Sequence, residues 1–325
     1  MDFKDIVGHE NIISNMKRAI ENDKVNHSYL FEGPEAVGKK KFALALAKTL
    51  LCKEGGLEPC NKCSSCIKFE SGNHPDMYLI KPEKDVIKKE QVEEAIRSMI
   101  TKPLESRRKI YIVDDSYKMT KEAQNGFLKT LEEPPAYVNM ILISRSSGSI
   151  LPTILSRCEV IKFFPIEKAK IIDFLMKKYG KTREEADFIS SFSKGSIGKA
   201  IDLSLSEDFA QMRDDTIEIV DNVLNGDKLK VFASMTFFDE NEDNIEEILD
   251  IILYWFRDLL IYKETGLEEL LINKDKVGLL SSETFLTKGK INVIIETVQS
   301  TKDNLSRRVN YQLSLETMLL KIQEV

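Results

Sequence analysis

The stretch GPEAVGKK, residues 33–40, decides the fold of this chain. It matches the phosphate-binding pattern G-x-x-x-x-G-K-[ST] at Gly33, Gly38 and Lys39, whereas Lys40 stands where the pattern has serine or threonine. Glycines in such a loop let backbone N–H groups point at an anion, and the helix that follows adds the positive end of its dipole. The pattern indicates a nucleotide-binding type of loop; the alternative is a plain strand-to-helix turn with solvated lysines.

Strands and helices alternate around this loop. Short apolar runs predict five strands, and apolar residues at helical spacing predict helices between them. The expected strands are residues 27–33, 76–80, 109–113, 140–144 and 159–164, and the expected helices include residues 39–51, 90–100 and 121–133. Pro134 and Pro135 should stop the last of these helices. Such alternation predicts an α/β domain with a parallel sheet covered by helices on both faces.

The second half of the chain shows almost only helical periodicity. Two apolar stripes mark it, namely Ile245, Leu249, Ile252, Phe256 and Leu259, and then Leu305, Val309, Met318 and Ile322. Gly195 and Gly198 should break the first helical stretch, and a polar segment near residues 204–214 fits a boundary. We therefore expect a core at residues 1–165, a helical lid at 166–207 and an all-helical domain at 208–325.

The net charge of −6 is unevenly distributed. Residues 1–165 hold 26 Lys and Arg against 23 Asp and Glu, or +3, and residues 166–325 hold 21 against 30, or −9. An acidic second half disfavours a nucleic-acid surface there, so we expect any DNA contact in the first half. No apolar run reaches the ~18 residues of a membrane span, and the amino terminus lacks the apolar stretch of a signal peptide. These features predict a cytoplasmic protein, in which clustered cysteines indicate a metal rather than disulfides.

Lys40 and two aspartates decide what chemistry the loop supports. The missing hydroxyl would bind Mg²⁺, whereas an ammonium has no lone pair for a metal and repels it. Asp114, at the end of a predicted strand, fits the acid that holds the metal, and Asp115 stands where a longer glutamate normally polarises the attacking water. We expect no efficient hydrolysis. Weak metal-free nucleotide binding stays open, as does a plain acidic turn after the strand.

Four cysteines form the second motif, Cys52, Cys60, Cys63 and Cys66, spaced C-x7-C-x2-C-x2-C. Two-residue gaps let neighbouring thiolates converge on one ion, and four thiolates suit tetrahedral Zn²⁺ in a closed structural site. An iron–sulfur cluster also uses C-x2-C-x2-C, but its usual fourth ligand lies downstream and precedes a proline. We expect structural zinc in a module at about residues 52–70, with a cluster or buried free thiols as the alternatives.

A third motif is Ser156-Arg157-Cys158, just before the last predicted strand. Arg157 at such an edge is either an ordinary surface charge or an arginine finger. An arginine finger places a planar, always charged group against a phosphate that a neighbouring subunit binds. The fifth cysteine, Cys158, lies far from the other four in sequence and has no motif partner.

Together these motifs resemble bacterial clamp-loader subunits of the AAA+ class, most closely the delta-prime type of DNA polymerase III. The segments that carry the resemblance are IVGHENI (6–12), GPEAVGKK (33–40), the four cysteines, NHPDMYLIKPE (73–83), KIYIVDDSYKMT (109–120), LKTLEEPP (128–135), ILPTILSRC (150–158), GSIGKA (195–200), YWFRDLL (254–260) and NYQLSLETMLL (310–320). The likeness spans nearly the whole chain, and LKTLEEPP together with Ser-Arg-Cys is its most specific part.

The resemblance implies one subunit of a hetero-pentameric ring, with tau/gamma and delta subunits as partners, that loads a sliding clamp onto primed DNA. It also implies an AAA+ core, a lid, a helical collar that holds the ring, structural zinc at the cysteines, and a role for Arg157 in trans.

Three positions distinguish the two types of subunit that the resemblance allows. The catalytic tau/gamma relatives keep Thr or Ser after the loop lysine, Glu in the second acidic position and Arg in the lid motif. Here these positions hold Lys40, Asp115 and Gly198, which favours a non-hydrolysing subunit. The alternative is a catalytically active, tau/gamma-like ATPase. An autonomous nucleic-acid-binding protein is disfavoured by the acidic second half and the lack of an aromatic–basic cluster.

Overall fold

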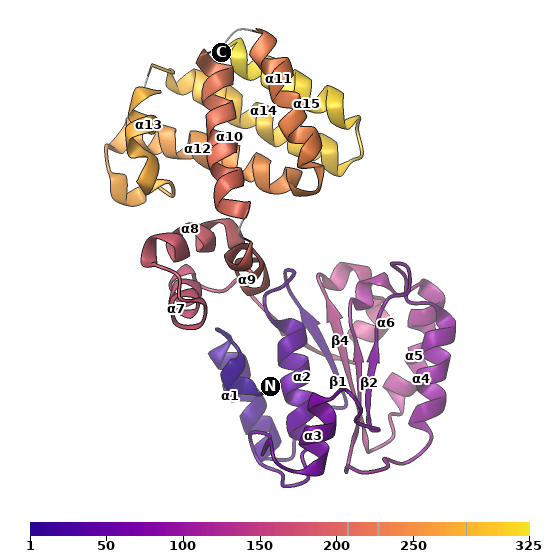
Figure 1. The fold of residues 1–325 in the computed structure, drawn as a ribbon. Helices are drawn as coiled ribbons and strands as arrows, with labels where there is room; N and C mark the ends of the chain where they lie inside the picture. Colours follow the sequence, from indigo (N-terminus) through magenta and orange to yellow (C-terminus); the bar gives the residue numbers. More distant parts are fainter. Residues whose placement is uncertain (207, 226–227, 284) are drawn as a thin grey trace. The chain divides into compact units, whose positions relative to one another are not determined.

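The computed structural model describes residues 1–206, 208–225, 228–283 and 285–325 (Figure 1). The chain falls into two compact units. The first comprises Met1–Thr182 and Ser193–Ile201, and the second comprises Arg183–Phe192 and Asp202–Val325. The expected division into core, lid and C-terminal domain stays a prediction, and the segment expected to form the lid contributes residues to both units.

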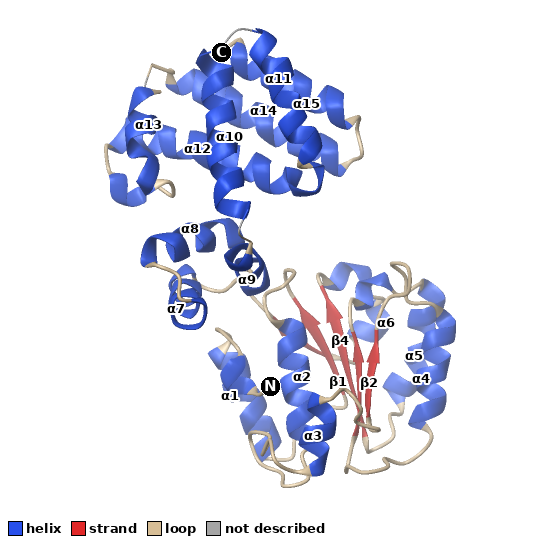
Figure 2. Cartoon of the chain, viewed as in Figure 1, coloured by secondary structure: helices blue, strands red, loops and turns tan. Residues whose placement is uncertain are grey.

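The first unit is built on a five-stranded sheet in the order β2-β3-β4-β1-β5, in which every pair is parallel (Figure 2). The strands are β1 (Ser28–Glu32), β2 (Met77–Ile80), β3 (Lys109–Val113), β4 (Val138–Ser144) and β5 (Glu159–Lys162). All five predicted strands are confirmed, as is the α/β class with a parallel sheet. Strand β4 lies between β1, which leads into the loop, and β3, which is followed by Asp114. Because these strands run parallel, the two candidate site segments emerge at the same edge of the sheet.

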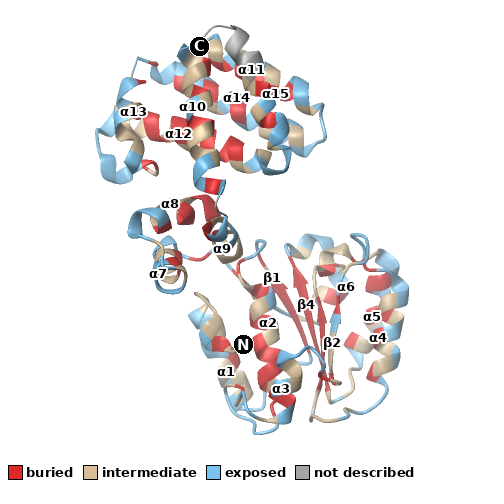
Figure 3. Ribbon diagram, viewed as in Figure 1, coloured by how far each residue is buried: buried red, intermediate tan, exposed pale blue. Residues whose placement is uncertain are grey.

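Helices cover both faces of this sheet (Figure 1). One face carries α1 (Glu10–Glu21), α2 (Lys39–Leu51) and α3 (Ser64–Glu70), and the other carries α4 (Lys89–Met99), α5 (Lys121–Glu132) and α6 (Pro152–Leu155). Successive strand residues alternate between the two cores: Phe31 packs with Phe42 of α2, and Leu30 packs with Phe127 of α5. The central strands are buried, as Figure 3 shows, because both faces are covered.

Local signals explain where α5 begins and ends. Thr120 caps its start, since the Thr120 side chain accepts a hydrogen bond from the backbone N–H of Ala123. The helix ends at Glu132, just before Pro134 and Pro135, as predicted.

Three helices follow the core: α7 (Lys168–Tyr179), α8 (Arg183–Ser193) and α9 (Ile197–Leu205). Gly195 lies in the break between α8 and α9 with a φ of 83°, and a Cβ there would lie 2.5 Å from the Pro165 Cβ. Gly195 therefore breaks the helix as expected. The same expectation for Gly198 was wrong, because Gly198 lies inside α9.

The second unit is helical throughout its described residues. Its longer helices are α10 (Asp208–Asn225), α11 (Lys228–Glu240), α12 (Ile245–Thr265), α13 (Val277–Ser282), α14 (Lys288–Ser306) and α15 (Tyr311–Gln323). Short 3-10 turns in the two units lie at Phe3–Asp5, Ser116–Lys118, Ser147–Ser149, Glu242–Asn244, Glu268–Leu270 and Lys274–Lys276. No helix among the described residues is both long and apolar enough to cross a membrane.

The two predicted apolar stripes fare differently. The first lies on α12, where Leu249, Ile252, Phe256 and Leu259 are buried in the core around Trp255. The second is interrupted: α14 ends at Ser306, and Val309 lies outside any helix with 45% of its surface exposed. The cause is a turn in which Arg308 takes a φ of 60° and the Asn310 side chain accepts a hydrogen bond from the N–H of Leu313 at the start of α15.

Candidate functional site

The glycines of the loop are required by its backbone. Gly33 follows β1 with a φ of 153°, and a Cβ there would lie 2.2 Å from the carbonyl oxygen of Phe163. Gly38 stands just before α2 with a φ of 109°, a conformation that other residues rarely adopt. The strand–loop–helix geometry expected of a phosphate loop is therefore present.

Lys39 is turned onto its own loop. Its side chain is buried, and its Nζ donates hydrogen bonds to the carbonyl oxygens of Gly33, at 2.6 Å, and of Pro34. Burial lowers the pKa of Lys39, against the opposing influence of the Glu35 and Asp115 carboxylates. The ammonium that would meet the outer phosphates of a nucleotide is thus satisfied by the chain itself.

Lys40 and Asp114 form an ion pair. The Lys40 Nζ lies 2.7 Å from Oδ2 of Asp114, so the carboxylate expected to hold a metal faces an ammonium instead. Asp115 follows with a φ of 49° and lines the same cavity of about 320 Å³ as the two lysines and Gly38. The structure thus brings together at this cavity the selected loop and acidic residues except Gly33, which adjoins them through the hydrogen bond from Lys39.

Helix α9 closes over the loop at Gly198. The N–H of Gly198 donates to the carbonyl oxygen of Ala36 at 2.9 Å, and a Cβ at position 198 would lie 2.7 Å from the Ala36 Cβ. A second contact joins Glu35 of the loop to Arg145, 2.7 Å apart, at the end of β4. Sequence reasoning missed Ala36 and Arg145. The acidic Glu35 inside a phosphate-binding pattern was the one available signal, and its partner lies far along the chain.

Arg157 lies just beyond α6 and is not among the residues that line the cavity beside the loop. Its Nη1 donates to the carbonyl oxygen of Thr153 at 2.7 Å and to Oγ of Ser156, and its Nη2 lies 2.5 Å from Oε1 of Glu132. The next residue, Cys158, is less accessible to solvent than Arg157, and burial raises the pKa of its thiol to about 12. Glu132 was also missed, since nothing in its local sequence points to Arg157.

The four cysteines of the second motif converge. Their Sγ atoms all lie within 4.8 Å of one another, with Cys52 and Cys63 4.0 Å apart and Cys60 and Cys66 3.9 Å apart. Four thiolates at ~2.3 Å from a tetrahedral Zn²⁺ lie about 3.8 Å from each other, so the arrangement fits zinc.

The backbone supports ionised thiols in this cluster. Backbone N–H groups of Cys60, Cys63 and Cys66 donate to the sulfur of an earlier cysteine. Burial opposes ionisation of Cys63, but hydrogen bonds led by the Cys66 N–H lower the pKa of the Cys63 thiol to about 6. At Cys66 burial prevails and raises the pKa to about 12. A bound cation would ionise both, because the thiolate is the metal ligand.

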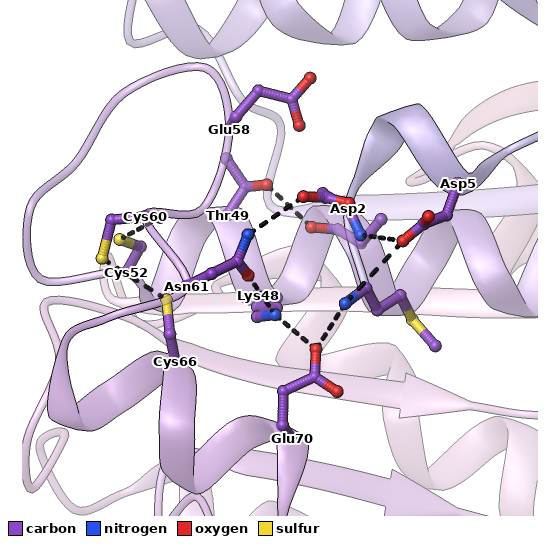
Figure 4. Close-up of polar contacts among 12 residues, drawn as sticks. Asp2, Asp5, Lys48, Thr49, Cys52, Glu58, Cys60, Asn61, Cys66 and Glu70 are labelled. Carbon is purple, nitrogen blue, oxygen red and sulfur yellow. Dashed lines mark hydrogen bonds and ion pairs between the residues drawn. The ribbon is translucent and has the colours of Figure 1, made fainter.

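Polar contacts tie the cysteine segment to α2 and to the first residues of the chain (Figure 4). The buried Lys48 contacts Oδ1 of Asn61 at 2.5 Å and pairs with Glu70. Asn61 in turn donates to Asp2, and Glu58 accepts the backbone N–H of Phe3. These partners lie far apart in sequence, which is why the cysteine spacing predicted the metal site without its supports.

The comparisons with known proteins agree over nearly the whole chain. The family described as "DNA polymerase III, delta subunit" matches residues 8–167, and its C-terminal counterpart matches residues 207–324. The DNA polymerase III subunit delta' of Bacillus subtilis (strain 168) is 34% identical over 312 residues, covering 94% of this chain and 93% of that protein.

The chain is also similar to a second relative and to a solved structure. The DNA polymerase III subunit gamma of Buchnera aphidicola subsp. Baizongia pistaciae is 30% identical over 285 residues, covering 80% of this chain and 76% of that protein. The crystal structure of a gamma subunit-related protein of DNA polymerase III from Thermotoga maritima aligns with 96% of this chain and 98% of that chain, at 20% identity and a TM-score of 0.44.

Proposed function

This chain belongs to the family of DNA polymerase III delta-prime subunits, and on that premise we propose how it works in a clamp loader. It is a ring subunit that does not hydrolyse ATP and that supplies Arg157 to the ATP site of a neighbouring subunit. In this role it helps to load the sliding clamp onto primed DNA during replication.

The ion pair between Lys40 and Asp114 carries the non-hydrolysing part of the proposal. Mg²⁺ takes oxygen ligands and would have to displace an ammonium from Asp114, the carboxylate expected to bind it. The Lys40 side chain is 45% exposed, so the pair itself is easily broken. Once released, however, the ammonium stays on the loop and still repels the metal, so the site opposes Mg²⁺ in either state.

The closed loop supports the absence of a working nucleotide site. Lys39 donates to two carbonyl oxygens of the loop, and Gly198 donates to a third, at Ala36. A bound nucleotide would require Lys39 to leave these oxygens and turn to its phosphates. Asp115, one methylene shorter than glutamate, adds a further reason to expect no turnover.

The position of Arg157 supports an action in trans. It lies outside the cavity of its own loop, on an exposed segment, and its guanidinium retains donors beyond those used by Thr153 and Glu132. An arginine supplied by a neighbour stabilises the charge that develops during phosphoryl transfer, and its loss typically slows the site it serves by ~10³-fold or more.

We also propose that Cys52, Cys60, Cys63 and Cys66 hold one structural zinc ion. All four thiolates would be ligands, so no position stays open for a substrate, and the metal would fix the fold of the module at about residues 52–70. The helical second unit would serve as the collar of a hetero-pentameric ring with tau/gamma and delta subunits, in the cytoplasm. Clamp and primed DNA would be contacted through the complex.

One experiment separates this proposal from the alternative of a tau/gamma-like ATPase. We expect steady-state ATP turnover by the purified chain to stay at background with Mg²⁺, with or without clamp and primed DNA. Robust Mg²⁺-dependent turnover that disappears in Lys39→Ala would establish the active ATPase instead.

The action in trans is tested in rebuilt rings. Arg157→Ala should assemble normally and load clamps slowly, and it should slow loading more than total ATP turnover, because the other sites keep their own arginines. Arg157→Lys should be nearly as slow, since a compact ammonium lacks the bidentate fork. Normal loading by a fully assembled Arg157→Ala ring would make Arg157 an ordinary surface charge.

A further inference from the structure

The side chain of Arg157 is held by a neighbouring helix. Its Nη2 lies 2.5 Å from Oε1 of Glu132, the last residue of α5, and its Nη1 donates to the carbonyl oxygen of Thr153 at 2.7 Å in α6. One carboxylate and one backbone oxygen therefore fix a long side chain that would otherwise sample many rotamers.

The two segments that carry Glu132 and Arg157 are also joined by hydrogen bonds of another residue. Gln124, also on α5 and only 4% exposed, donates through Nε2 to the carbonyl oxygen of Ser149 and accepts from the backbone N–H of Leu151. These bonds join α5 to the segment that leads into α6 and Arg157. The two segments that carry Glu132 and Arg157 are therefore joined by contacts other than the ion pair.

Stability does not account for the ion pair. The side chains of Arg157 and Glu132 are 31% and 50% exposed, and exposed pairs contribute little to the free energy of folding. What the pair does provide is orientation, because Glu132 occupies one edge of the guanidinium. The guanidinium has five N–H donors in a rigid fork, so donors on its other edge can still meet oxygen atoms.

We propose that Glu132 is a positioning residue for Arg157, which holds the guanidinium ready for a phosphate on the neighbouring subunit. This inference rests on the proposed function of Arg157. Without Glu132, the Arg157 side chain loses rotamer freedom only when it meets the phosphate of the neighbouring subunit. Ordering one such side chain corresponds to about a two- to tenfold loss in the rate of clamp loading.

Adjacent glutamates supply a matched control. Glu133 follows directly in sequence, is exposed, and makes no ion pair among the contacts of the described residues. Glu133→Gln and Glu132→Gln therefore remove the same charge from neighbouring positions. Glu132→Asp keeps the charge and shortens the side chain by one methylene, so it should restore part of the effect.

The test compares clamp loading by rebuilt rings that carry Glu132→Gln, Glu133→Gln, Glu132→Asp, Arg157→Ala or the Glu132→Gln/Arg157→Ala pair. Ring assembly and thermal unfolding are measured on each. We expect Glu132→Gln to slow loading about two- to tenfold at saturating ATP, Glu133→Gln to match the unaltered chain, and Glu132→Asp to fall between them. In the Arg157→Ala background, Glu132→Gln should have no further effect.

The outcomes distinguish this inference from the proposed function. If Arg157→Ala loads normally, the proposed function fails and the positioning role fails with it. If Arg157→Ala is slow but Glu132→Gln is as fast as or faster than the unaltered ring, only the positioning role is overturned. An effect of Glu132→Gln that persists without Arg157, or that Glu133→Gln reproduces, would also overturn it by showing a general effect of charge.

Discussion

The two ends of α2 differ in how their polar groups are satisfied. At its start, Lys39 and Lys40 bond to loop carbonyls and to Asp114, so the loop is satisfied by groups of the chain itself. At its end, Cys52 lies beside three other cysteine sulfurs, and the partners of these sulfurs among the described residues are weak backbone donors and one another. Where the chain itself supplies partners for the charged groups, a bound ligand adds little stabilisation. Four converging thiols gain much more from a bound cation, because the metal binds them as thiolates.

This comparison predicts that the metal matters far more to the fold than any nucleotide does. Cys63→Ser should lose the metal and make residues 52–70 sensitive to protease, while the sheet stays folded, because the module is an insertion between elements. The measurements are metal content by elemental analysis, which should give one zinc per chain, and limited proteolysis with mapped cleavage sites.

Cys158→Ser is the matched control for this experiment, because Cys158 lies outside the cluster. It should keep the zinc and an intact module. Iron in the purified protein, or no metal at all, would contradict the zinc assignment and with it the contrast between the two ends of α2.

The second unit offers a third case, the buried carboxyl of Glu283. The Glu283 side chain accepts one hydrogen bond, from Nε1 of Trp255, and its Oε1 has no partner among the described residues. Burial raises the pKa of Glu283 to about 7, against the Trp255 hydrogen bond, and the Asp221 carboxylate adds to the rise.

Stability should therefore fall as the pH rises through this range. Between about pH 4.5 and 7 the folded chain keeps a proton that the unfolded chain has lost, so the unfolding free energy decreases, by up to about 3 kcal/mol. Glu283→Gln should flatten this decline and be the more stable protein at pH 8. Denaturant unfolding at pH 5 and pH 8 measures both slopes, and parallel slopes would show that Glu283 does not titrate as described.

The supports of the cysteine module should have a smaller effect. Lys48 is buried, but its partner Glu70 is half exposed and can regain water when the pair is lost. Lys48→Met should therefore cost about 1–3 kcal/mol of unfolding free energy, from the loss of the hydrogen bonds that the buried Lys48 ammonium donates to Asn61 and Glu70. The zinc should remain bound, because no thiol changes.

Lys53→Met is the control for this variant, because Lys53 is an exposed lysine whose carboxylate partner, Glu105, lies 3.7 Å away. It should change the unfolding free energy by less than about 1 kcal/mol. Equal changes in unfolding free energy for the two substitutions would mean that the contacts of the buried Lys48 do not stabilise the module.

Patterns in short stretches of sequence predicted the features that depend on residues close together in the chain. Apolar runs located all five strands, and the C-x2-C-x2-C spacing located thiols that do converge. The pairing of Lys40 with Asp114 was within reach as well, since both positions were singled out, but the pattern gave no reason for the two to touch. Val309 shows the limit of periodicity, because a left-handed turn at Arg308 interrupts a stripe that apolar spacing alone had joined.

Contacts between distant segments were beyond such reasoning. Glu132 and Arg157 meet because α5 and α6 pack, and Glu35 meets Arg145 because β1 and β4 are neighbours in the sheet. Gly198 looked like a helix breaker, whereas its absent side chain lets α9 approach Ala36. In each case the relevant partner is set by the three-dimensional packing rather than by the residue type.

The smallest expected effect belongs to the loop itself. Lys40→Thr restores the hydroxyl of the phosphate-binding pattern and removes a partly exposed ion pair, which should change the unfolding free energy by less than about 1 kcal/mol. Turnover of ATP should nevertheless stay at background, because Asp115 is still shorter than glutamate and position 198 still lacks the arginine that the resemblance to tau/gamma subunits implies there. The measurements are Mg²⁺-dependent ATP turnover of the variant and the shift of its melting temperature with ATP, each compared with the unaltered chain. A large gain in ATP turnover would show that Lys40 alone prevents hydrolysis. The start of α2 would then be a nucleotide site blocked by one residue, and the other two departures, Asp115 and Gly198, would not be needed to explain the absence of turnover.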